Sequence, residues 1–179
     1  IMMRAVFIFL LLVASAPVVA QDRLALVVGI DGYEEIDDLS KASNDARSVS
    51  DVLDGIGFDV TTVIDADERR LNRALAEFTA SIDPGDEVLL YFAGHGIEID
   101  GRNYLLPSDA PDSASEWVIR SESINADEVL RGMQREGASV AVMILDACRD
   151  NPYAGSGRSV GGARGLNIVS APAGSFVLM

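Results

Sequence analysis

The sequence predicts an α/β domain in which a parallel β-sheet is covered by helices on both faces, giving three layers. Short apolar runs alternate along the chain with segments of helical periodicity, and this alternation is typical of parallel sheets. The apolar runs are almost continuous, as expected for strands that are buried on both faces. The chain has 179 residues, which is enough for one domain with a substantial core.

Four apolar runs are predicted to form the core strands. Each run is short and is bounded by glycine, proline or acidic residues, a pattern that favours strands. They cover residues 24–30, 58–64, 87–93 and 139–147. A hairpin arm is predicted over residues 101–107, and a further strand is predicted to begin at Ser175. Because that strand begins so close to the last residue, we expect the domain to be truncated at its C-terminus.

Three segments have apolar residues three and four positions apart, which predicts helices. They cover residues 42–56, 71–82 and 126–135. Gly57 closes the first helix, and Asp67 lies near the N-terminal end of the second, where the helix dipole favours acidic side chains. Asn125 and Glu128 form a capping box in front of the third helix.

Composition and charge exclude some classes of function. The formal net charge of −14 at pH 7 argues against a nucleic-acid partner, because the neutralisation of phosphates requires an excess of Lys and Arg. An acidic surface can attract basic peptides. A doubly wound domain that binds a nucleotide is a further alternative. The segment "GIDGYEE" after the first strand argues against it, because it lacks the G-x-G-x-x-G spacing and places acids where phosphate would lie.

Residues 1–20 have the three-part pattern of a secretory signal peptide. Met and Arg at positions 2–4 precede an apolar run at 5–12, and "VVA" at 18–20 is a candidate cleavage site. The apolar run is short for a membrane span. We therefore expect an exported protein, periplasmic or extracellular, whose folded domain covers residues 21–179. Contact with the membrane is expected only if the signal segment stays uncleaved.

The only histidine and the only cysteine of the chain, His95 and Cys148, each follow the end of a predicted strand. Active sites of open parallel sheets lie outside the carboxyl ends of the strands. If the two strands are neighbours, the imidazole and the thiol meet at one edge. A free thiol has a pKa of about 8.5 and is only slightly ionised at neutral pH, so a neighbouring imidazole can activate it by taking its proton. The alternative for each residue alone is structural: a buried, inert cysteine and a hydrogen-bonded histidine.

The segments "YFAGHG", around His95, and "DACRDNP", around Cys148, lie 53 positions apart and resemble caspase-like cysteine peptidases of the metacaspase and paracaspase type. In caspases the histidine lies about 50 residues before the cysteine. "ALVVGIDGY" and "ASNDA" also resemble this family, peptidase C14, in its bacterial exported branch. The resemblance covers residues 24–179 and implies a caspase–hemoglobinase-like fold and a cysteine endopeptidase. A catalytically silent interaction or regulatory module of the same fold remains the alternative.

The resemblance implies a role for each matching residue. His95 corresponds to the general base and Cys148 to the nucleophile, and the amides of Gly96 and Cys148 correspond to the oxyanion hole. Asp146 and Asp31 correspond to carboxylates that line the pocket for the residue before the cut. Two carboxylates there would hold Arg or Lys and repel Asp, so the expected substrate is a polypeptide with a basic residue before the cut. The alternatives are a carboxylate bonded to loop amides for Asp146 and an ordinary turn residue for Asp31.

The segment after the nucleophile, residues 149–167, is rich in Gly, Ser and Arg and is predicted to be a loop. If the pocket accepts arginine, Arg149, Arg158 and Arg164 are candidate self-cleavage sites. The alternative is a solvated loop. Metacaspases commonly carry His-Ser-Gly after the nucleophile, where this chain has "RDNP", and this departure leaves the specificity open.

No cofactor or metal is predicted. Some metacaspases need calcium, but the candidate ligands here are scattered along the chain and form no dense loop of oxygen ligands. These candidates are Asp109, Asp112 and Asp127. Beyond the proposed pair, no thiol or imidazole remains for a zinc site.

Overall fold

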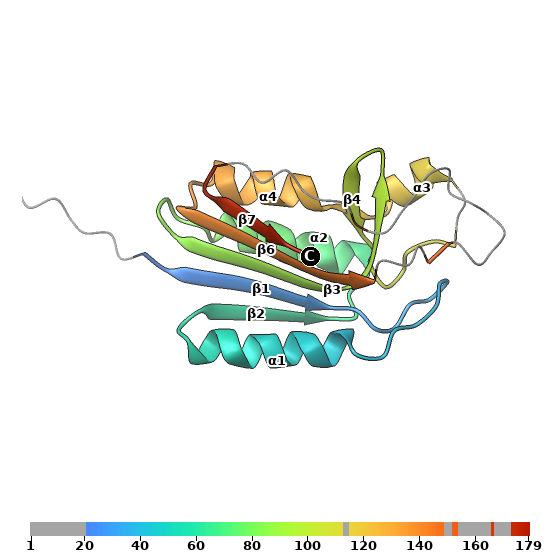
Figure 1. The fold of residues 1–179 in the computed structure, drawn as a ribbon, viewed down its shortest axis with the longest axis horizontal. Coiled ribbons are helices and arrows are strands. Elements are labelled where there is room, and N and C mark those ends of the chain that lie inside the picture. The colour runs from blue at the N-terminus through green and yellow to red at the C-terminus, as the bar shows by residue number, and fades with distance from the viewer. Residues whose placement is uncertain (1–20, 113–114, 149–151, 154–165, 167–172) are drawn as a thin grey trace, which may run out of the picture.

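The computed structural model describes residues 21–112, 115–148, 152–153, 166 and 173–179; of Cys148 it describes the backbone. In these residues, seven strands form one sheet (Figure 1). Five of them run parallel in the order β2-β1-β3-β6-β7. They are β1 (Arg23–Gly29), β2 (Asp59–Ile64), β3 (Glu87–Ile99), β6 (Val140–Cys148) and β7 (Ser175–Leu178). β4 (Arg102–Leu105) runs antiparallel to the end of β3, and β5 (Ile124–Asn125) pairs with β4.

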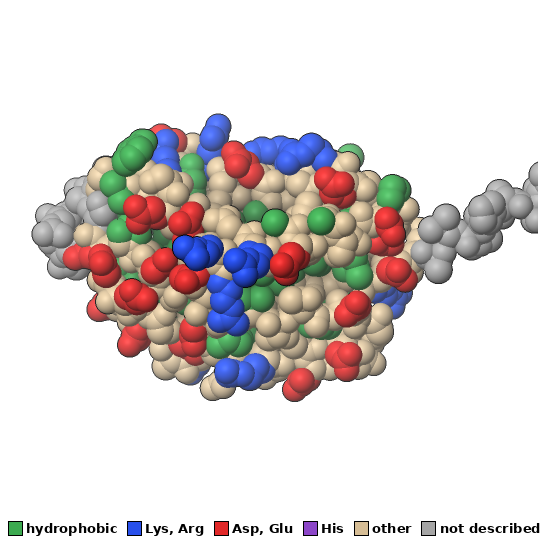
Figure 2. All heavy atoms as spheres, turned by 180° about the vertical axis from the view of Figure 1, so that it is seen from behind, with side chains coloured by type: hydrophobic (Ala, Val, Ile, Leu, Met, Phe, Trp, Pro, Cys, Tyr) green, Lys and Arg blue, Asp and Glu red, His purple; other side chains and the backbone are tan. Residues whose placement is uncertain are grey.

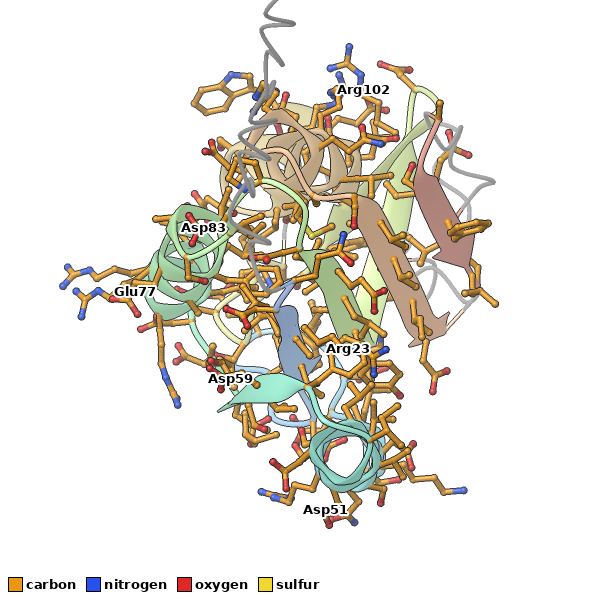
Figure 3. All side chains as sticks on the ribbon, turned by 90° about the vertical axis from the view of Figure 1, so that its left-hand side faces the viewer. Arg23, Asp51, Asp59, Glu77, Asp83 and Arg102 are labelled. Carbon is orange, nitrogen blue, oxygen red and sulfur yellow. The ribbon has the colours of Figure 1, made fainter. Side chains whose placement is uncertain are left out.

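Helices cover the two faces of this sheet unequally. α1 (Ala42–Gly55) packs on one face, whereas α2 (Glu68–Ala80) and α4 (Ala126–Arg135) lie on the other. Figure 3 shows the layers nearly end-on, with Asp51 of α1 and Glu77 of α2 on opposite sides of the strands. The short helix α3 (Glu116–Ser121) precedes β5. The predicted three-layer α/β fold is confirmed.

Local chemistry explains where the helices begin. The side chain of Asn125 accepts a hydrogen bond from the Glu128 amide, and α4 has the predicted bounds. Asp67 caps α2 in the same way, so that helix begins at Glu68, three residues before its first predicted apolar position. Gly29 lets α1 approach β1 closely, because a Cβ there would lie 2.6 Å from the carbonyl oxygen of Ala42. This contact fixes the N-terminal end of α1 over the carboxyl end of β1.

The prediction that the third strand ends at Ala93 is wrong, because β3 continues to Ile99. After its parallel segment, β3 changes partner and pairs with β4, with Gly96 opposite Leu105 and Ile99 opposite Arg102. Ile97 and Ile99 are buried in the core that this hairpin closes. His95 therefore lies inside a long strand, at the residue before the change of partner, and Cys148 is the last residue of β6.

Among the residues that the structure describes, no helix has both the length and the apolar character needed to cross a bilayer.

Candidate active site

β3 and β6 are neighbours, which is the condition that the sequence left open. They pair in parallel over nine residues, and the last pair of Cα partners is His95 and Cys148. The preceding partners on the same face are Ala93 and Asp146. The backbone thus brings the only histidine and the only cysteine of the chain to adjacent positions near the carboxyl ends of the parallel strand segments.

His95 is held by the loop that follows β1. Its side chain is buried, with 6% of the residue exposed, and its Nε2 lies 2.8 Å from the carbonyl oxygen of Asp37. Since a carbonyl oxygen only accepts hydrogen bonds, Nε2 must carry the proton, and Nδ1 then has a free lone pair. Nδ1 has no hydrogen-bond partner among the described groups. Nδ1 is therefore the ring nitrogen that can still accept a hydrogen bond.

The loop itself is pinned by carboxylates. The amides of Asp31 and Gly32 both donate to Oδ1 of Asp65, at 2.8 and 3.2 Å. The amide of Tyr33 donates to Oδ1 of Asp38 at 2.8 Å. Asp65 adopts a positive φ of 44°, a conformation that is uncommon for a residue other than glycine. The backbone that orients His95 is therefore anchored at several points.

The two glycines beside His95 leave room for neighbouring side chains. A Cβ on Gly94 would lie 2.9 Å from the hydroxyl of Tyr33 and 2.9 Å from the ring of Phe92. A Cβ on Gly96 would lie 2.8 Å from the side chain of Leu166. The space that a side chain would need at these two positions is therefore taken by Tyr33, Phe92 and Leu166.

A cavity of about 290 Å³ lies next to His95, between the N-terminal end of α1 and the ends of β3 and β6. Its lining includes Gly94 and Asp146 together with Asp45 and Lys41. Oδ2 of Asp146 accepts a hydrogen bond of 3.1 Å from the hydroxyl of Tyr91. Burial raises the pKa of Tyr91, and the charges of Asp146 and Asp45 raise it further, so the phenol stays protonated and acts as the donor. The cavity therefore carries two carboxylates and one ammonium group.

Asp31 lies next to this cavity but is engaged elsewhere. Its Oδ1 accepts from the Ala42 amide at 2.8 Å, and its Oδ2 accepts from the Ser43 amide at 3.0 Å. Burial tends to raise the pKa of Asp31, but the hydrogen bonds from Ser43 and Ala42 outweigh it and hold that pKa below its ordinary value. Asp31 thus caps α1, as its carboxylate satisfies two amides at the helix start.

Asp45 is the residue that sequence reasoning missed. It belongs to the "ASNDA" segment that opens α1, one turn into the helix, and it lines the cavity together with Asp146. The segment itself was a signal, since it is one of the motifs that resemble the family. Tyr33 and the carbonyl group of Asp37 were also missed, because only the folded loop brings them to His95.

The other predicted positions fall into two groups, those outside the described residues and the candidate calcium ligands. Arg149, Arg158 and Arg164, like the signal segment at 1–20, lie outside the described residues. Of the candidate calcium ligands, Asp109 accepts a hydrogen bond from the amide of Glu68, the Asp112 amide donates to Glu35, and Asp127 lies in the first turn of α4. In the described part of the chain, no group of three or more His, Cys, Asp or Glu residues could hold a metal ion.

A larger hollow of about 860 Å³ lies between α2 and α4, on the face of the sheet opposite α1. Figure 2 shows this side of the molecule, with acidic side chains spread over it and basic ones among them. His95, Asp146 and Asp45 do not line the hollow, so it is separate from the candidate active site.

Comparisons with known proteins agree on the family. The caspase domain, Peptidase_C14, matches residues 22–172. The human mucosa-associated lymphoid tissue lymphoma translocation protein 1 is 33% identical over 131 residues, and its mouse homolog is equally similar. The match covers 73% of this chain and 15% of each of those proteins. A crystal structure of a Geobacter sulfurreducens protein, with 17% identity, superposes with a TM-score of 0.55 over 71% of this chain and 50% of that one. At that identity the likeness shows the fold alone.

Proposed function

This chain belongs to the caspase-domain family of cysteine peptidases, Peptidase_C14, and from this membership we propose that it is a cysteine endopeptidase that cuts polypeptides after arginine or lysine. The observation that carries the proposal is the pairing of His95 with Cys148 across β3 and β6, with Nδ1 of His95 left without a described partner. A base held in this way next to the only thiol of the chain is what nucleophilic catalysis requires.

In the proposed reaction, Nδ1 of His95 takes the proton of the Cys148 thiol, and the thiolate attacks the carbonyl carbon of the scissile bond. The amides of Gly96 and Cys148 stabilise the resulting oxyanion. The imidazolium then gives its proton to the leaving amine, and a thioester forms. Water, deprotonated by His95, attacks the thioester, and the thiol is regenerated as the acid product leaves.

The carbonyl group of Asp37 supports this cycle. Its hydrogen bond to Nε2 fixes the tautomer in which Nδ1 is the base, and the bond strengthens when the ring becomes positively charged.

The two carboxylates of the cavity support the preference for a basic residue. Asp45 and Asp146 carry two negative charges, and Lys41 carries one positive charge. The cavity therefore attracts the guanidinium or ammonium group of a substrate side chain and repels a carboxylate. Tyr91 holds Oδ2 of Asp146 in place. We assign the second carboxylate of the pocket to Asp45, because both oxygens of Asp31 already accept amides of α1.

The same specificity makes Arg149, Arg158 and Arg164 candidate self-cleavage sites. The signal segment at 1–20 implies that the substrates are met in the periplasm or outside the cell. The chain spans about 15% of the length of the curated relatives it matches, so the activity of those whole proteins is not carried over.

A panel of fluorogenic peptides with Arg, Lys or Asp before the reporter tests the proposal. The wild-type chain is expected to release the reporter from the Arg and Lys peptides, and Cys148→Ala is expected to reduce this release to background, because the substitution removes the nucleophile. Turnover that survives Cys148→Ala would remove the nucleophile from the proposal. A preference for the Asp peptide would contradict the acidic specificity pocket. No turnover of any peptide would favour the catalytically silent module.

A further inference from the structure

Tyr33, in the loop that follows β1, contacts His95 in two ways. Its hydroxyl oxygen accepts the main-chain N–H of His95 at 2.7 Å. Its ring lies 4.7 Å from the imidazole, centroid to centroid, with an angle of 50° between the planes. Together with the Asp37 carbonyl group, the same loop therefore contacts the backbone, the ring and one ring nitrogen of His95.

The position of Tyr33 is restrained by burial and by hydrogen bonding. Tyr33 is buried, with 8% of the residue exposed, and its own amide is fixed by Asp38. The hydroxyl reaches His95 only because Gly94 has no Cβ, since a Cβ there would lie 2.9 Å from the hydroxyl oxygen. A buried N–H that loses its acceptor must find another partner or stay unsatisfied, so the backbone at His95 depends on this hydroxyl.

We propose that Tyr33 is a positioning residue for His95, which keeps the ring where Nε2 remains bonded to Asp37 and Nδ1 remains available as the base. The inference rests on the proposed function, in which His95 is that base. The hydroxyl group controls the backbone of His95 and the aromatic ring restrains the imidazole. The glycine before His95 then has a defined purpose, which is to admit the hydroxyl of Tyr33.

Tyr33→Phe removes the hydroxyl and keeps the ring, and Tyr33→Leu removes both. For peptides cut after Arg, Tyr33→Phe is expected to lower kcat about tenfold, as the loss of one hydrogen bond implies. Tyr33→Leu is expected to lower kcat about a hundredfold, the effect of misplacing a catalytic group by about 1 Å. KM stays within about twofold in both variants, because the position of the base matters in the transition state and not in substrate binding.

The imidazole can also be observed directly. His95 is the only histidine, so a tag-free, ¹⁵N-labelled chain gives imidazole nitrogen signals from one residue. We expect the neutral imidazole of the wild type to be a single tautomer with the proton on Nε2. In Tyr33→Phe these signals are expected to shift or broaden. Tyr104→Phe is the matched control, because Tyr104 is equally buried but lies on β4; it should leave both kcat and the imidazole signals unchanged.

Gly94→Ala provides a second route to the same result, because its methyl group would lie 2.9 Å from the hydroxyl oxygen of Tyr33 and displace it. It is expected to change the imidazole signals as Tyr33→Phe does. Unchanged kcat and unchanged imidazole signals in Tyr33→Phe, even in a less stable protein, would overturn the inference. If the wild type shows no turnover, the proposed function fails, while the imidazole signals still decide whether Tyr33 positions His95.

Discussion

Replacement of His95 by alanine is expected to lower kcat/KM for a peptide cut after Arg by about 10²- to 10⁴-fold, the usual contribution of a general base. The physical reason is that a thiol without a base is only slightly ionised at neutral pH, and that the leaving amine then lacks its proton donor. KM should change little, because the ring is buried behind the cavity and contributes little to substrate binding. Steady-state kinetics at a fixed pH measures the effect.

Two controls separate this loss from unfolding. The thermal transition of His95→Ala should remain cooperative, and added free imidazole should restore part of the turnover by entering the space of the missing ring. A variant that keeps more than half of the wild-type kcat/KM would show that His95 is not the base. A loss of activity that accompanies a lost thermal transition would attribute the effect to folding instead.

The second large effect is expected in the cavity beside α1. Asp45 and Asp146 are exposed in the free chain, and a guanidinium bound in the cavity would cover them. Asp146→Asn and Asp45→Asn should each lower kcat/KM for the Arg peptide by about 30-fold or more, because the removal of one partner of a charge pair buried in this way costs at least about 2 kcal/mol. The same variants should cut a peptide with a neutral Gln before the reporter almost as well as the wild type does. The ratio of the two kcat/KM values is the quantity to measure, since it cancels general losses of activity.

Two further aspartates are the matched controls. Asp51→Asn changes an exposed carboxylate on the same helix and should leave the ratio unchanged (Figure 3). Asp31→Asn replaces one of the two acceptor oxygens, so one of the amides of Ala42 and Ser43 loses its acceptor. It should lower the free energy of unfolding by about 1 kcal/mol and should also leave the ratio unchanged. If Asp31→Asn alters the ratio and Asp45→Asn does not, the pocket belongs to Asp31, as the resemblance first implied.

The sequence predicted much of the sheet because its signals are local. The apolar runs at β1, β2 and β6 are bounded by turn residues, and the capping pair at Asn125 gave the bounds of α4. The sequence also showed that His95 and Cys148 each follow an apolar run. That the two residues are Cα partners depends on the register between β3 and β6, which only the folded structure shows.

What the sequence could not show depends on contacts between distant segments. β3 extends past Ala93 because β4 folds back along it and pairs with it. The sequence at 94–99 has no local pattern that predicts this change of partner. The contacts of Tyr33 and of the Asp37 carbonyl group with His95 form only when the loop between β1 and α1, residues 30–41, folds over His95. Asp31 precedes α1 and Asp45 lies in its first turn. Only the hydrogen bonds in the structure show that Asp31 is bound to the amides at the helix start, whereas Asp45 lines the cavity.

The central claim is that the ring of His95 reaches the sulfur of Cys148, and the alkylation of that sulfur tests it most directly. The chain has one cysteine, so the intact mass after treatment with iodoacetamide at pH 7 reports on a single thiol. The wild type is expected to react at least about ten times faster than His95→Ala, because the imidazole converts a slightly ionised thiol into thiolate. Equal rates in the two proteins would mean that the ring does not reach the thiol, and would contradict the account.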